Sequence, residues 1–188
     1  MAALLGVSIV WWIQLLRGQG PLVLIPAFFA VAAVSILVHE LPQKFMARRL
    51  GLEIIFKVWG SGIFLGWLLA PLGIFFPAYG STYVKQIDWW YNPKKDKIGV
   101  IFAIGPFSSL VLGFALWIIR LLAASSLLAE SAKIGYITSL SIAVLNLIPM
   151  QAAGGFVWDG KKIFEWNRKV WVTLVIASIA LISLNALF

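Results

Sequence analysis

The chain has 188 residues, of which 62% are hydrophobic and 12% are charged, and its formal net charge is +8. Soluble domains carry about 25% charged residues, so this composition excludes an ordinary soluble domain. We expect a single membrane-embedded domain over residues 1–188. The positive charge fits basic loops on the cytoplasmic side of a membrane, without nucleic acid as a partner. The absence of cysteine excludes disulfides and thiolate metal sites.

The long apolar runs predict an all-α polytopic membrane protein with about five to six transmembrane helices. The first covers residues 3–16, which we interpret as a retained helix because no basic residue precedes it. The second covers residues 21–41 and begins at a proline, which suits a helix start. The β-branched and aromatic residues within 51–59 predict a short strand. Later helices are predicted over residues 98–123, 134–149 and 170–188.

Residues 62–79 are apolar but contain glycines and prolines, so this segment either spans the membrane once or enters and leaves on one side. The basic residues favour the re-entrant alternative. Of the 15 lysines and arginines, 12 lie within residues 44–57, 85–97 and 161–169. A re-entrant segment puts all three groups on one face, as the positive-inside tendency prefers. It also puts His39 and Asp159 on the same face, whereas a full span separates them.

The only histidine of the chain, His39, ends a long apolar run and is followed by Glu40. These are the first two residues of a helical zinc-hydrolase motif whose second histidine stands at i+4, with the acid as general base. Here the i+4 residue is Gln43, and Pro42 lies within the same turn. Ionisable groups at such places are functional candidates. The alternative is that Glu40 forms an exposed i,i+4 pair with Lys44.

Three further features have open interpretations. Asp159 precedes a glycine, a pair that marks either a simple turn or a carboxylate in a site. Asn146 either bonds across helices or bonds its own helix backbone. Pro149 is expected to end the helix over 134–149, and Pro106 to interrupt the helix over 98–123.

Taken together, these motifs resemble the site-2 protease family of intramembrane zinc metalloproteases, and its short microbial members in particular. The resemblance covers about residues 21–171. The motifs that carry it are residues 39–51, 105–109, 146–149 and 159–167.

The resemblance implies zinc as a cofactor and assigns roles to particular residues. His39 resembles the first zinc ligand, Glu40 the general base, and Asp159 the carboxylate ligand. Gln43 stands where the family has its second histidine, and Ser109 where it has an asparagine. A glutamine oxygen is a poor exchange for an imidazole in a site that needs three protein ligands. We therefore expect the zinc site to be labile or empty.

Two functions follow from these expectations. The first is an intramembrane zinc metalloendopeptidase homologue that acts on transmembrane segments of other proteins, with weakened or lost activity. The alternative is a non-catalytic pseudoprotease that binds or scaffolds transmembrane helices. Both place the chain in the cell membrane as a multi-pass protein in contact with lipid. A small transporter is disfavoured, because the apolar runs contain few ionisable groups.

Overall fold

The computed structural model describes residues 25–69, 72, 80–85, 95–152 and 156–187. The described residues are mostly helical, as predicted, with six helices and one two-stranded sheet. The helix predicted over residues 3–16 lies outside them. The elements are α2 (Ile25–Arg49), β1 (Ile54–Val58), α3 (Gly60–Leu69), β2 (Gly80–Val84), α4 (Lys95–Leu122), α5 (Ser126–Asn146), α6 (Asp159–Trp166) and α7 (Arg168–Leu187).

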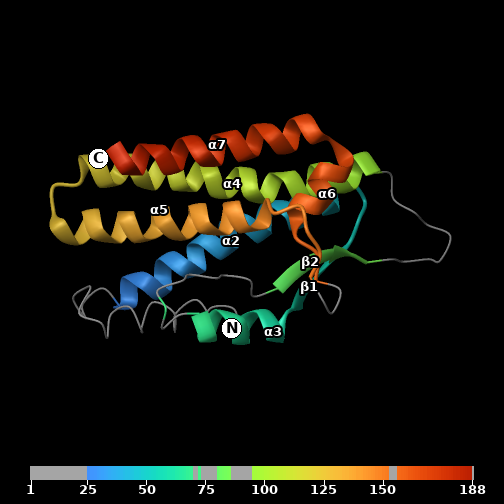
Figure 1. Ribbon diagram of the computed structural model, residues 1–188, viewed down its shortest axis with the longest axis horizontal. Helices are drawn as coiled ribbons and strands as arrows, with labels where there is room; N and C mark the ends of the chain where they lie inside the picture. The colour runs from blue at the N-terminus through green and yellow to red at the C-terminus, as the bar shows by residue number, and fades with distance from the viewer. Residues whose placement is uncertain (1–24, 70–71, 73–79, 86–94, 153–155, 188) are drawn as a thin grey trace.

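Helices α4, α5 and α7 run alongside one another, and α2 crosses beneath α4 and α5 (Figure 1). The hairpin of β1 and β2 lies near one end of this bundle, next to α6. A short link joins α4 to α5, where Ser125 caps α5 by accepting a hydrogen bond from the Leu128 N–H at 3.3 Å. The end of α5 and the start of α7 are tied by Trp171 Nε1, which donates to the Leu147 carbonyl at 2.8 Å.

Both internal prolines lie within continuous helices. Helix α2 runs through Pro42 to Arg49, well beyond the predicted end, and α4 runs through Pro106. The predicted interruption at Pro106 is therefore wrong. Burial explains why the missing hydrogen bonds are tolerated, because one face of α2 stays inside the bundle on both sides of Pro42. The buried residues of this face are Ala32, Ser35, His39, Gln43 and Ala47.

The strand predicted within residues 51–59 is confirmed as β1, whereas its partner β2 was not predicted. The two strands are antiparallel, and Val58 lies opposite Gly80. The chain therefore leaves the hairpin and returns to it at the same place. The two ends of residues 59–79 therefore lie side by side. This pairing agrees with the alternative in which the segment begins and ends on one side.

By length and composition, two helices in the described ranges could cross a membrane. They are α4, with a mean hydropathy of 2.1, and α5, with 1.2. Large apolar side chains on α4, such as Val111 and Leu122, are exposed at 53% and 79%. These two helices alone do not support a count of five to six spans.

The contact between α6 and the end of α5 depends on a glycine, which gives a first prediction. A Cβ atom at Gly160 would lie 2.2 Å from the Leu147 carbonyl oxygen, which belongs to the backbone. Gly160→Ala should therefore destabilise the fold by about 1–3 kcal/mol, the usual effect of overpacking. Thermal unfolding in detergent should show a loss of roughly 2–4 °C per kcal/mol.

The matched control is Gly60→Ala, because a Cβ there meets nothing within 4 Å. Its unfolding midpoint should stay near that of the parent. Equal midpoints for the Gly160 and Gly60 variants would contradict the close approach of α6 to α5.

Candidate functional site

Polar side chains from three helices meet in the interior at one end of the bundle. Helix α2 supplies His39 and Gln43 one turn apart, α4 supplies Ser109, and α6 supplies Asp159 as its first residue. Their exposed fractions are only 1%, 0%, 0% and 3%. Buried polar groups need partners, so this cluster is held together by its own contacts.

The contacts within the cluster join residues that are 120 positions apart in the sequence. Nε2 of His39 lies 3.3 Å from Oδ2 of Asp159, and Nδ1 lies 3.0 Å from Oγ of Ser109. Gln43 Nε2 donates to the same Asp159 Oδ2 at 2.7 Å and lies 3.4 Å from His39 Nε2. The structure thus brings together His39, Gln43 and Asp159, as a shared site requires. Their roles as zinc ligands stay predictions.

A glycine of α4 makes room for this arrangement. A Cβ atom at Gly105 would lie 2.1 Å from Nε2 of Gln43 and 3.0 Å from Nε2 of His39. Helix α4 can therefore approach α2 closely only because residue 105 has no side chain. Pro42 does not turn residue 43 away from residue 39, since the two side chains meet inside an unbroken helix.

Glu40 belongs to the same site through a different set of contacts. Its Oε2 accepts a hydrogen bond from Oγ1 of Thr82 on β2, at 2.7 Å. The Thr82 carbonyl accepts from Nζ of Lys162 at 2.6 Å, and this ammonium also lies 3.3 Å from Oδ1 of Asp159. The hairpin therefore links the acid of α2 to the carboxylate of α6. This contact to Thr82 replaces the surface pair with Lys44 that the sequence left open.

Burial and charge act against each other on α6. Burial raises the pKa of Asp159, but the Lys162 ammonium and the contacts with His39 and Gln43 outweigh it, so this pKa lies below its ordinary value. Burial also holds the pKa of Lys162 below its ordinary value, although Asp159 opposes that shift. Asp159 is therefore an ionised carboxylate at neutral pH, with a basic partner beside it.

Sequence reasoning missed several of these residues. Lys162 could have been found, because it stands three positions after Asp159 and i,i+3 pairs meet on a helix. However, the sequence predicted no helix between residues 149 and 170, so α6 was missed. Thr82 gave no signal beyond its strand propensity. Of the two roles left open for Asn146, the structure shows a bond to its own helix backbone, since its Nδ2 donates to the Ile142 carbonyl at 2.9 Å.

This geometry defines a class of protein before any comparison is made. A histidine and an acid stand together on a buried helix, and a distant aspartate is folded against that histidine. This is the arrangement that the sequence resemblance to zinc metalloproteases implies.

Comparison with known proteins agrees with this class. The chain is 30% identical over 152 residues to a curated protein of Methanocaldococcus jannaschii named "Putative zinc metalloprotease MJ0611". The match covers 80% of this chain and 74% of the archaeal protein. The chain therefore belongs to the same family of zinc metalloproteases. No protein-family model matches the sequence, and no solved structure matches it.

The side chains at the site do not fit a catalytic zinc with three good protein ligands. Across the described residues, no group of three or more His, Cys, Asp or Glu side chains could hold a metal ion. Gln43 presents its amide nitrogen to Asp159, and an amide nitrogen donates hydrogen bonds instead of binding metal. Its oxygen Oε1 is buried without a hydrogen-bond partner. Only His39 and Asp159 remain as ligands of ordinary strength.

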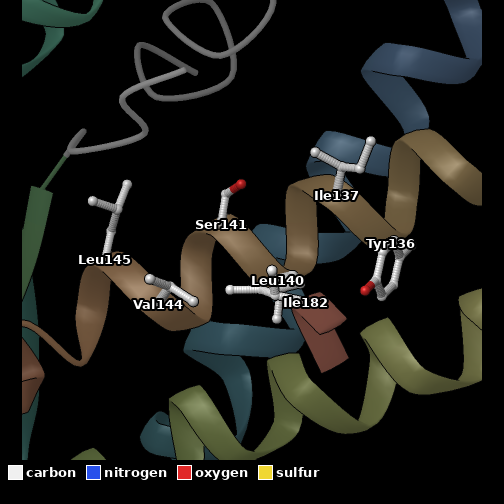
Figure 2. Close-up of a pocket in the computed structure, with 7 residues that line it drawn as sticks. All are labelled: Tyr136, Ile137, Leu140, Ser141, Val144, Leu145 and Ile182. Carbon is white, nitrogen blue, oxygen red and sulfur yellow. The ribbon is translucent and has the colours of Figure 1, made fainter. Parts of the chain in front are cut away.

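Two apolar cavities lie outside the polar cluster. One, of about 390 Å³, lies along α5 and is also lined by Ile182 of α7; Figure 2 shows its seven lining side chains. None of them belongs to the cluster. The second, of about 660 Å³, lies between α2 and α4. No cluster side chain lines it either, although Val38 and Pro42, which do, each precede a cluster residue in α2.

The second prediction tests whether the lack of an imidazole at residue 43 is what weakens zinc binding. Gln43→His should raise zinc affinity, because an imidazole nitrogen binds zinc at about 2.0–2.1 Å where an amide binds poorly. Since α2 is continuous, Pro42 need not be replaced as well. Isothermal titration calorimetry on purified protein should show near-stoichiometric zinc in the variant and little in the parent. Full zinc occupancy in the parent would instead make Gln43 a working ligand.

Proposed function

We propose that this chain is a membrane-embedded protein of the site-2 protease type that holds transmembrane segments of other proteins. We further propose that its own peptidase activity is weak or lost. The observation that carries the proposal is the meeting of His39, Gln43 and Asp159 in the protease layout with only two ligands of ordinary strength. The relative at 30% identity supports the metalloprotease ancestry.

The groove between α2 and α4 is the proposed place for a bound segment. It is lined by apolar side chains of both helices, and several are well exposed, among them Leu37 at 50% and Val111 at 53%. Apolar grooves of this kind accept helices whose apolar residues recur every turn. A segment lying there would pass directly beside the buried polar cluster, as a substrate of an intramembrane peptidase must.

We propose that α2 and α7 cross the membrane together with α4 and α5. Helix α2 has 25 residues and α7 has 20, so their lengths are roughly 37 and 30 Å at 1.5 Å per residue. These lengths match the hydrocarbon thickness of a bilayer. Arg48 and Arg49 in the last turn of α2 then mark the cytoplasmic face. Any further spans would come from residues outside the described ranges.

A second candidate function is active zinc-dependent peptide hydrolysis with Gln43 as an unusual ligand. One observation favours it: Oε1 of Gln43 is buried without a hydrogen-bond partner. If the amide turned over, this oxygen would face His39 and Asp159. In that case Glu40 would serve as the general base, as the motif implies.

The third prediction separates these two candidates by cleavage. A single-pass transmembrane peptide is reconstituted in vesicles with the parent protein or with Glu40→Gln, and cleavage products are measured with added zinc. The first candidate predicts equal, near-background product from both proteins. Zinc-dependent product from the parent that disappears in Glu40→Gln would establish the second candidate.

The same vesicles test binding at the groove. A photo-crosslinker placed at Leu37 should capture the peptide. Ala115→Trp, which fills the groove from α4, should reduce that capture several-fold. Ile176→Trp is the control, because Ile176 is 60% exposed on α7, away from the groove. If both tryptophan variants capture the peptide as well as the parent, the groove is not the binding site.

The fourth prediction concerns topology. The parent has no cysteine, so single cysteines report one position each. Lys85→Cys, after β2, and Lys161→Cys, in α6, should be labelled from the same side of the membrane, because β2 contacts α6. Glu130→Cys, near the start of α5, should be labelled from the other side. Labelling of positions 85 and 161 from opposite sides would contradict the proposed arrangement.

A further inference from the structure

Two atoms of the site that could bind a metal already lie close to one side-chain nitrogen, that of Gln43. Nε2 of His39 and Oδ2 of Asp159 lie 3.4 and 2.7 Å from the amide nitrogen of Gln43. The amide nitrogen donates to Oδ2 of Asp159, and Nε2 of His39 lies 3.3 Å from the same oxygen. The amide therefore stands where a bound cation would join the histidine to the carboxylate.

The other carboxylate oxygen also has a partner from the protein. Oδ1 of Asp159 lies 3.3 Å from Nζ of Lys162. The same ammonium donates to the Thr82 carbonyl at 2.6 Å and lies 3.7 Å from the centre of the Phe102 ring. Its side chain is only 14% exposed. These three contacts hold the Lys162 ammonium in place beside the carboxylate of Asp159.

We propose that Gln43 and Lys162 together replace the metal of this site. The Gln43 amide donates to the Asp159 carboxylate beside His39, and the Lys162 ammonium supplies the positive charge that the carboxylate needs. The native fold of this chain is therefore independent of metal. This inference concerns how the site is held together, and it stands whether or not the groove binds transmembrane segments.

The neighbouring residues fit this role of the glutamine. Ser109 lies 3.0 Å from Nδ1 of His39, and its hydroxyl can donate to that nitrogen. Nε2 of His39 then carries the hydrogen, which it can donate to Oδ2 of Asp159 at 3.3 Å. Gly105 leaves the space that the amide occupies, because a Cβ there would lie 2.1 Å from Gln43 Nε2.

The charge of Asp159 explains why the Gln43 amide points its nitrogen, and not its oxygen, toward the carboxylate. Turning the amide over would bring Oε1 against Oδ2 of Asp159, where the nitrogen now lies at 2.7 Å. Two acceptors at that distance repel unless a cation lies between them. Without a cation, the orientation with the nitrogen inward is favoured even though it leaves Oε1 buried and unpaired.

The first test uses the unmodified protein. Its thermal unfolding midpoint in detergent is measured with excess EDTA and with excess zinc chloride. A fold independent of metal predicts midpoints within about 1 °C. A metal present at 100 times its dissociation constant would raise the midpoint by roughly 5–10 °C for a chain of this size. A shift of that size on chelation would overturn the proposal.

The second test isolates the charge of Lys162 in the Gln43→His background, where zinc binding is expected. Adding Lys162→Met should tighten zinc binding several-fold, because it removes a positive charge that lies 3.3 Å from the Asp159 carboxylate and would repel a bound cation. The matched control adds Lys161→Met instead. Lys161 contacts Gln151 at 2.8 Å and does not contact the carboxylate of Asp159 in the described structure. This control should change the affinity less than twofold.

Each result of the second test decides the role of Lys162. Affinity that is unchanged or weaker in Gln43→His/Lys162→Met, in protein with parental helical content by circular dichroism, overturns the role of Lys162 as the replacing charge. If Gln43→His alone binds no zinc, the added Lys162→Met must make binding measurable, and failure to do so also overturns it. Lys162→Gln serves if the methionine variant does not fold. It also lacks the charge and keeps a hydrogen-bond donor for the Thr82 carbonyl.

Discussion

The buried hydrogen bond from Gln43 to Asp159 is the contact on which the rest of this structure depends. At 2.7 Å it joins α2 to α6 across 116 positions of sequence. A bond to an ionised acceptor in a dry interior is strong, and breaking it leaves a buried charge without its partner. The close approach of α4 at Gly105 and the hairpin contact through Thr82 both converge on the same carboxylate or its neighbours.

The chain belongs to a zinc metalloprotease family, but its described side chains do not supply three good zinc ligands at the site. Ancestry is carried by the order of the motifs and by the relative at 30% identity. Chemistry depends on the individual donor atoms, and residue 43 offers an amide where the resemblance implies an imidazole nitrogen. A fold can keep its layout while the site changes, because layout is set by many packing contacts and the site by a few atoms.

The sequence predicted the helical fold, the strand β1 and the meeting of His39 with Asp159. It failed where tertiary contacts override local signals. Pro42 and Pro106 looked like helix breakers, yet the buried faces on both sides of each proline keep α2 and α4 continuous. Helix α6 was missed because it has 8 residues and a polar sequence, and only Asp159, Gly160 and Ile163 are buried. Thr82 could not be assigned, since its role depends on contacts with two distant elements.

The pairing of Val58 with Gly80 has an evolutionary consequence. Both ends of the intervening segment are fixed at adjacent positions of one hairpin. Loop-closure entropy grows slowly with length, so the number of residues between these ends can change without moving Thr82 from Glu40. Insertions and deletions there can therefore leave the interior of the bundle unchanged.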